Sequence, residues 1–388
     1  MKNKLLTFLG IMFMLSANVT GQEAPWRFSR VESPQIHADR SVTFNLFAPA
    51  ASEILLNGGW MGWGENVALV KNDTGLWSVT AGPLEPEIYT YAFYVDGVKV
   101  LDPANTSVVR DGRRFESMLL IPGERSALYM VRDVPHGTLS KVWYESPTLE
   151  MNRRMYVYTP PGYAESGDRY PVLYLLHGGG GDEDAWTTLG RTCQIMDNLI
   201  AEKRCRPMIV VMTNGNPGDA AAPGEEPVLE EARQRGGIFE MGTRRFEESL
   251  VKDVIPFVEK HYRTLAGSEN RAVSGLSMGG MQTMNLGFDH PEMFSYYGVM
   301  SMGITGKDRS GRNWFQDVEA RMQHLKEYGY QLYWVGCGTD DFLHDAAVNL
   351  VEEMKRHDME VVYLETGGGH TWSNWRIYLS ELAPLLFR

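Results

Sequence analysis

Cysteine and positive charge are both scarce in this sequence. Only three cysteines occur in 388 residues, Cys193, Cys205 and Cys337. Three thiols can neither all pair within the chain nor supply four ligands to a zinc ion, so the sequence excludes a disulfide framework and a four-cysteine metal site. Lys and Arg number 37 against 49 Asp and Glu, which gives a formal net charge of −12. This negative balance argues against nucleic acid as a partner and favours a neutral substrate.

The sequence also lacks an apolar run of the length that a membrane-spanning helix needs, about 20 residues. The run at 5–15 has eleven residues, follows the basic residues Lys2 and Lys4, and precedes the small residues at 19–21. This layout is typical of a secretory signal peptide, so residues 1–21 are interpreted as one rather than as a buried N-terminal helix. The sequence therefore predicts an exported protein, periplasmic or extracellular, with no membrane span.

Two patterns of residues follow one another along the rest of the chain. Residues 25–123 hold short alternating runs of apolar and polar residues broken by Gly, Pro, Asn and Asp, which predicts an immunoglobulin-like β-sandwich. Residues 124–136 are interpreted as a linker. From 137 to 388 strand-like and helical runs alternate, which predicts an α/β domain with a mostly parallel sheet. The Gly-rich segments 213–242 and 303–313 follow predicted strands, where such a sheet places its ligands.

The strongest chemical signal is a G-x-S-x-G motif formed by Gly275, Ser277 and Gly279. A strand-like run at 271–274 precedes the motif, and a helix-compatible run at 281–288 follows it. In this context the glycines permit a sharp turn that exposes the serine oxygen above the sheet of an α/β hydrolase. The sequence therefore predicts Ser277 as a catalytic nucleophile rather than as part of an ordinary Gly-rich turn.

A serine nucleophile needs a histidine base and an acid that orients it, and α/β hydrolases carry them in the order Ser, acid, His. His370 follows a strand-like run and three glycines, and it is the predicted base. Asp340 and Asp341 both follow the preceding strand-like run. Asp341 is the favoured acid, with Asp340 as a turn or capping residue. His344 is a weaker candidate, because no acid in the required order accompanies it.

The segment HGGGG at 177–181 is the candidate oxyanion hole. It follows the apolar run 172–176 and matches the HGGG-type segment whose backbone N–H groups stabilise a tetrahedral intermediate. One donor is assigned to Gly179 or Gly180 and the other to Met278, the residue after the nucleophile. The histidine of the segment is assigned a structural role. A phosphate-binding loop is excluded, because the Lys-Ser/Thr pair of a P-loop does not follow.

Four motifs in this order, LLHGGGGDE, GLSMGGMQT, GTDDFL and GGGHTW, resemble the esterase D group of α/β hydrolases. Within that group the sequence is similar to the feruloyl and acetyl-xylan esterases of carbohydrate esterase family 1, over about residues 137–388. The resemblance implies the triad Ser277, Asp341 and His370 and no metal or organic cofactor. It also implies release of ferulate or a related hydroxycinnamate from arabinoxylan, with feruloylated xylan or xylo-oligosaccharide as the substrate.

The N-terminal segments VTFNLFAPAA, GLWSVTAGPL and YTYAFYVDGVKVLDPAN resemble a family 48 carbohydrate-binding module. Trp60 and Trp63 are its candidate sugar-stacking residues, although a Trp in a small sandwich is more often part of the core. Two roles are open for this domain. It either anchors the enzyme on polysaccharide or packs on the esterase domain and forms a wall of the acyl pocket.

Four other functions compete with a feruloyl esterase. An acetyl-xylan esterase, a siderophore esterase that cleaves a catecholate trilactone, and an acyltransferase would all use the same catalytic residues. A polysaccharide-binding protein without activity is the alternative from a different class, and the complete triad argues against it. The sequence leaves the oligomeric state open.

Overall fold

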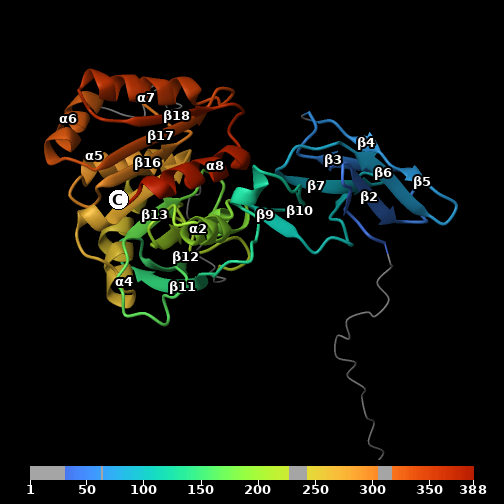
Figure 1. The fold of residues 1–388 in the computed structure, drawn as a ribbon, viewed down its shortest axis with the longest axis horizontal. Coiled ribbons are helices and arrows are strands. Elements are labelled where there is room, and N and C mark those ends of the chain that lie inside the picture. The colour runs from blue at the N-terminus through green and yellow to red at the C-terminus, as the bar shows by residue number, and fades with distance from the viewer. Residues whose placement is uncertain (1–30, 63, 227–242, 305–316) are drawn as a thin grey trace, which may run out of the picture.

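The computed structural model describes residues 31–62, 64–226, 243–304 and 317–388 (Figure 1). The predicted signal peptide, Trp63 and parts of both Gly-rich segments lie outside the described residues. Cys193, Cys205 and Cys337 are free thiols. No helix in the described ranges has both the length and the apolar character needed to cross a membrane.

The N-terminal part forms two antiparallel sheets that pack on each other. Alternation along the strands explains the packing, because in β2 the side chains of Val42, Phe44 and Leu46 all point into the core between the sheets. The first sheet has the order β1-β2-β6-β5, and the second has the order β4-β3-β7-β10-β9 with β8 on β7. Their bounds are β1 Gln35–Ile36, β2 Val42–Phe47, β3 Ile54–Gly58, β4 Val67–Ala68, β5 Val70–Lys71, β6 Leu76–Ala81, β7 Ile88–Val95, β8 Val98–Val100, β9 Val108–Asp111 and β10 Arg114–Leu120.

The second part is built on an eight-stranded sheet with the order β11-β12-β14-β13-β15-β16-β17-β18. The strands from β14 to β18 run parallel, whereas β11 and β12 pair antiparallel at one edge. The central strands are buried on both faces, as their continuous apolar runs predict. The bounds are β11 Thr138–Ser146, β12 Met151–Thr159, β13 Val172–Leu176, β14 Ile209–Thr213, β15 Arg271–Leu276, β16 Tyr296–Met300, β17 Leu332–Gly338 and β18 Val362–Thr366.

Helices cover both faces of this sheet and divide the core into two apolar clusters. This arrangement, with its order of strands and helices, is the α/β-hydrolase fold that the sequence predicts. One face carries α1 Ala185–Thr188, α2 Thr192–Ala201, α8 Trp372–Leu382 and the turn η6 Ala383–Leu385. The other carries α3 Arg245–Ser249, the π-helical turn η4 Leu250–Val254, α4 Ile255–His261, α5 Met278–Asp289, α6 Val318–Tyr328 and α7 His344–Arg356. The short turns η1 Ser126–Leu128 and η5 Ser268–Asn270 precede β11 and β15.

The two parts touch through buried charges. Strands β9 and β10 form the side of the sandwich that faces the larger domain (Figure 1). Arg110 of β9 forms a bidentate ion pair with Asp182, at 2.5 and 2.8 Å. Glu87, just before β7, accepts a hydrogen bond at 2.7 Å from Arg376 of α8. The connecting segment contributes Tyr129, whose hydroxyl donates to the same Glu87 oxygen.

Candidate active site

Ser277 lies at a sharp turn between β15 and α5. Its backbone angles are φ 52° and ψ −114°, a conformation that a residue with a side chain adopts only when its surroundings enforce it. The Ser277 N–H donates to the Met300 carbonyl at 2.9 Å, which ties the turn to β16. The turn places the serine at the carboxyl end of the parallel strands, where open α/β sheets bind their ligands.

Two glycines allow this turn, because other backbone atoms pass too close to them for a side chain. A Cβ atom at Gly275 would lie 2.5 Å from the carbonyl carbon of Gly279. A Cβ atom at Gly279 would lie 2.6 Å from the carbonyl oxygen of Leu176 in β13. The spacing of the G-x-S-x-G motif therefore follows from the close approach of α5 to the sheet.

His370 follows β18 and Asp341 follows β17. Both therefore lie at the carboxyl ends of the parallel strands, as Ser277 does. Each Asp341 carboxylate oxygen lies 3.0 Å from His370 Nδ1. Asp341 is buried, whereas Asp340 is exposed and donates its backbone N–H to the Gly368 carbonyl. The structure thus places Asp341, and not Asp340, against the imidazole.

Hydrogen bonds keep the Asp341 carboxyl ionised. Burial raises its pKa, but hydrogen bonds from His370 and from the Leu343 N–H outweigh burial, so the pKa lies below its usual value. An ionised carboxylate holds the proton on Nδ1 and leaves Nε2 able to accept one. His344 lies elsewhere, with its Nε2 bonded to Glu365 at 2.7 Å.

Two aromatic rings contact the His370 imidazole. The Trp375 ring lies perpendicular to it with centroids 5.0 Å apart, and the Phe342 ring lies 4.5 Å away. Trp375 is itself fixed, because its Nε1 donates to Ser301 Oγ at 2.9 Å. Phe342 is 77% exposed, so its outer surface is open to a substrate. Sequence reasoning singled out neither ring, although Phe342 belongs to the DDF segment and Trp375 follows His370 by five residues.

Ser277 and His370 line one cavity of about 360 Å³. No hydrogen bond joins their side chains in the described chain, and such bonds in unliganded enzymes often close only when substrate binds. Most of the lining comes from the larger domain, but Asp111 of β9 belongs to the sandwich. That position favours a sandwich that packs on the esterase domain and forms a wall of the acyl pocket over one that anchors the enzyme on polysaccharide. The remaining lining residues are Gly178, Gly179, Gly181, Ala185, Leu276, Thr371, Trp372 and Trp375.

The four glycines of the HGGGG segment do not all line the cavity. Gly178, Gly179 and Gly181 line the cavity, whereas Gly180 faces the sandwich, where a Cβ atom at Gly112 would lie 2.7 Å from the Gly180 carbonyl oxygen. Of the two alternatives in the sequence, this position favours Gly179 as an oxyanion donor. Met278 is the first residue of α5, and the first N–H groups of a helix have no partner within it.

We call the HGGGG segment at 177–181 the oxyanion loop. Its histidine fixes the loop to the segment that follows β14. His177 is buried, its Nδ1 donates to the Gly178 carbonyl at 2.7 Å, and its Nε2 accepts from the Gly215 N–H at 2.7 Å. Burial lowers the pKa of His177, which keeps the ring neutral and able to accept at Nε2. This contact gives the residue the structural role that the sequence predicts.

A second buried network supports the same loop. Glu183 accepts from Arg154 Nε and from the Ala222 N–H, both at 2.8 Å, and from Asn214 at 3.2 Å. These partners come from β12 and from the segment after β14, so the network links the oxyanion loop to two neighbouring segments. No local sequence pattern identifies such a network, because its members are tens of residues apart.

Trp60, the described one of the two candidate sugar-stacking residues, packs within the sandwich. Its ring stacks on Phe44 with centroids 5.4 Å apart and contacts Tyr89 edge-on at 5.7 Å. A Cβ atom at Gly58 would lie 2.3 Å from this ring, so the ring also covers the backbone of β3. Trp63 lies outside the described residues.

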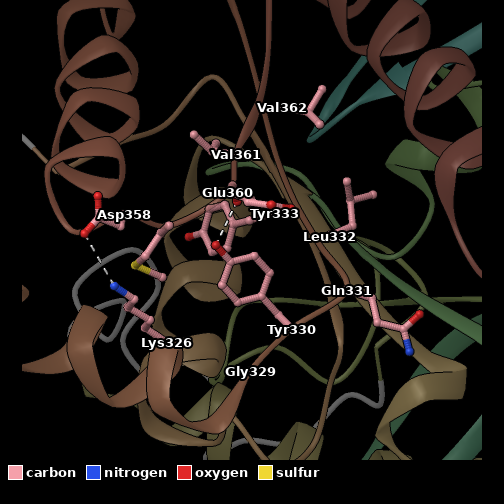
Figure 2. A pocket seen from close by; sticks show the side chains of 11 residues that line it. Lys326, Gly329, Tyr330, Gln331, Leu332, Tyr333, Asp358, Glu360, Val361 and Val362 are labelled. Carbon is pink, nitrogen blue, oxygen red and sulfur yellow. Dashed lines mark hydrogen bonds and ion pairs between the residues drawn. The ribbon is translucent and has the colours of Figure 1, made fainter.

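A separate cavity of about 440 Å³ lies at the amino-terminal ends of the parallel strands, where Leu332 begins β17 and Val362 begins β18 (Figure 2). Lys326 and Asp358 form an ion pair of 3.9 Å beside it. Among its described lining residues there is no Ser, Cys or His. Within the described ranges no group of three His, Cys, Asp or Glu side chains is arranged to bind a metal.

The fold is that of an α/β hydrolase, and it places Ser277, Asp341 and His370 beyond the carboxyl ends of its parallel strands. The chain belongs to the esterase family, whose model matches residues 146–386. It is 32% identical to an endo-1,4-beta-xylanase/feruloyl esterase of Xylanibacter ruminicola over 365 residues, which are 92% of this chain and 46% of that protein. The chain spans about half the length of the first curated relatives it matches.

Solved structures give the same fold. A CE1 ferulic acid esterase of the anaerobic fungus Anaeromyces mucronatus is 25% identical with a TM-score of 0.55, over 67% of this chain and 95% of that one. The enterobactin esterase of Shigella flexneri is 15% identical with a TM-score of 0.62, over 89% of this chain and 92% of that one. The second match extends beyond the esterase domain, so the likeness in fold includes much of the sandwich.

Proposed function

We propose that this protein is an exported serine esterase that releases ferulate or a related hydroxycinnamate from feruloylated xylan or xylo-oligosaccharide. The observation that carries the proposal is that His370, whose Nδ1 lies 3.0 Å from the buried Asp341 carboxylate, lines the same cavity as Ser277. The substrate class is supported by a 32% identical relative named as a xylanase and feruloyl esterase. It is also supported by a similar fungal esterase whose structure contains ferulic acid.

The reaction begins with attack of Ser277 Oγ on the ester carbonyl carbon. His370 Nε2 takes the hydroxyl proton, and Asp341 stabilises the imidazolium that forms. The backbone N–H groups of Gly179 and Met278 stabilise the negative oxygen of the tetrahedral intermediate. The bond between the carbonyl carbon and the sugar oxygen then breaks, and His370 returns the proton to the leaving sugar hydroxyl.

The acyl-enzyme that remains is an ester between ferulate and Ser277. Water attacks its carbonyl carbon, His370 takes the water proton, and collapse of the second tetrahedral intermediate returns that proton to Ser277 Oγ. Because a protonated imidazole cannot accept a proton, turnover falls in acid solution. No step needs a metal or an organic cofactor.

The central test is the Ser277→Ala variant, assayed with methyl ferulate, methyl p-coumarate, acetylated xylan and a short-chain aryl ester. We expect loss of turnover by at least about 10³-fold on each substrate that the wild type cleaves, with an unchanged circular dichroism spectrum. Ser52→Ala, at an exposed serine of the sandwich, is the matched control and retains full activity. A folded Ser277→Ala protein with wild-type turnover would refute the mechanism.

The same panel tests the substrate class. A wild-type protein that cleaves acetylated xylan but neither hydroxycinnamate ester is an acetyl-xylan esterase. Assays with a ferric catecholate trilactone and with an added sugar acceptor detect the siderophore esterase and the acyltransferase. Export is tested separately, by N-terminal sequencing of the mature protein from the periplasm and the medium, where a start near Gln22 is expected.

A further inference from the structure

The two N–H groups assigned to the oxyanion hole come from different segments of the chain. The N–H of Gly179 belongs to the oxyanion loop after β13, and the N–H of Met278 lies at the start of α5. Such donors stabilise the transition state when both lie about 2.7–3.1 Å from the developing negative oxygen. The spacing between the two segments therefore has to be set before the ester reacts.

Gln282 joins α5 to the segment that follows β14. It lies four residues after Met278, on the same face of the helix. Its side chain is buried, and its Nε2 donates to the Gly215 carbonyl at 2.9 Å. The helix packs closely on this glycine, because a Cβ atom at Gly215 would lie 3.0 Å from Gln282 Oε1 and 3.1 Å from Met278 Cε.

Gly215 connects this helix to the oxyanion loop. Its N–H donates to His177 Nε2 at 2.7 Å, and His177 Nδ1 donates to the Gly178 carbonyl at 2.7 Å. The same carbonyl accepts from the Gly181 N–H at 3.1 Å, which closes the turn that contains Gly179. Three hydrogen bonds in series thus connect α5, which carries one donor, to the turn that carries the other.

The segment that carries Gly215 is itself fixed. Asn216 Nδ2 donates to the Gly181 carbonyl at 3.0 Å, so this segment holds the loop at a second point. The buried Arg153 of β12 donates to the Asn214 and Asn216 carbonyls at 2.8 and 2.7 Å. The loop and the segment therefore form one unit, and Gln282 ties α5 to that unit.

The contribution of Gln282 is a single donor. Its Oε1 is buried and has no hydrogen-bond partner among the described residues. Unsatisfied buried oxygens destabilise a fold, so stability alone does not account for an amide at this position. In the opposite orientation of the amide, Oε1 would face the Gly215 carbonyl oxygen, and two acceptors cannot share a hydrogen bond.

We propose that Gln282 is a positioning residue of the esterase reaction, which holds the N–H groups of Gly179 and Met278 at a fixed spacing. It does not line the catalytic cavity, so it acts through the backbone that it binds. The inference rests on the proposed function, because that function assigns the oxyanion hole to these two N–H groups. Without the Nε2 donor, α5 and the loop can move apart, which weakens stabilisation of the negative oxygen.

Gln282→Met tests this role, because methionine keeps the length of the side chain and removes the donor. We expect kcat/KM for methyl ferulate and for a short-chain aryl ester to fall at least about tenfold. Removal of a whole oxyanion donor costs about 10²–10³ in kcat, and displacement costs less. Thr283→Val is the matched control, because the buried Thr283 hydroxyl donates to the Gly279 carbonyl at 2.8 Å within α5. This control should keep kcat/KM within about twofold of the wild type.

An inhibitor separates positioning from damage to the fold. With an arylalkyl trifluoromethyl ketone, Ser277 Oγ bonds to the carbonyl carbon and His370 Nε2 takes the hydroxyl proton. The ketone oxygen gains the electron pair of the broken π bond and becomes the negative oxygen in the oxyanion hole. Because such an analogue resembles the transition state, its Ki should rise in Gln282→Met by about the factor by which kcat/KM falls. Loss of folded protein alone lowers the apparent kcat and leaves Ki unchanged.

The outcomes that would overturn the inference are distinct from failure of the proposed function. Wild-type kcat/KM in folded Gln282→Met, an unchanged Ki, or equal losses in Gln282→Met and Thr283→Val would each overturn it. Gln282→Leu gives the same measurements if the methionine variant does not fold, and failure of both to fold would show a purely structural role. A wild-type enzyme that cleaves the aryl ester but no hydroxycinnamate ester refutes the proposed substrate class instead, and the aryl ester still decides the role of Gln282.

Discussion

Replacement of Glu87 by Gln tests how strongly the two domains are joined. Arg376 is 2% exposed and Glu87 is 7% exposed, and Arg376 Nη2 lies 2.7 Å from Glu87 Oε1. Glu87 also forms an ion pair of 3.1 Å with Arg125. The variant keeps the shape of the side chain but removes the one negative charge that faces two cations. Arg376 then stays buried with no counter-charge among its described contacts.

The expected cost follows from that burial. Removing one partner of a buried ion pair destabilises a protein by about 3–5 kcal/mol. For a domain of this size each kcal/mol lowers the midpoint of thermal unfolding by roughly 2–4 °C. Glu87→Gln should therefore unfold on the order of 10 °C below the wild type, measured by circular dichroism.

Glu85→Gln provides the matched control. Glu85 precedes the same strand, but its side chain is 83% exposed and lies 3.8 Å from Arg40. Surface pairs of this kind contribute about 0–1 kcal/mol, so this variant should unfold with the wild type. Equal midpoints for the two variants would show that the buried pair does not hold the domains together.

Three further predictions concern the site and its supports. Asp341→Asn should lower kcat by about 10⁴-fold and Asp340→Asn by less than about threefold, because only Asp341 holds the histidine tautomer; equal losses would reject this assignment. Burial raises the pKa of Glu247 to about 7 from 4.5, so its carboxyl is protonated when folded at pH 5. The wild type should then lose up to about 3 kcal/mol against Glu247→Gln between pH 5 and pH 8 in urea titrations, and a constant difference would contradict the shift. Gly112→Ala should lower kcat, because the new methyl group meets the Gly180 carbonyl and displaces the oxyanion loop; unchanged kinetics would show that the loop tolerates the contact.

The parts of the site that the sequence predicts are those with a local signature. Ser277, Asp341 and His370 each follow a strand-like run and lie in a Gly-rich turn, so chain order and strand ends were enough to propose them. The two patterns of residues likewise predict the α/β-hydrolase fold and its preceding sandwich. In these cases the physical cause, hydrophobic periodicity broken by turn residues, acts over a few neighbouring residues.

The parts that the sequence did not reveal depend on contacts between distant segments. Glu87 and Arg376 are 289 residues apart, and no periodicity relates them. Asp111 enters the cavity wall only because β9 packs on the oxyanion loop. The choice between Gly179 and Gly180 was open for the same reason, since the position of the hairpin at Gly112 decides which glycine turns away.

The Glu87–Arg376 pair also limits how this chain could be recombined. Consider a gene fusion that joins the esterase domain to another domain, with its boundary in the connecting segment. The fused protein would contain Arg376 but not Glu87. The new partner would have to present an acid at the same position, or Arg376 would have to change in the same step. The sandwich is therefore not exchangeable for another domain without a compensating change at Arg376.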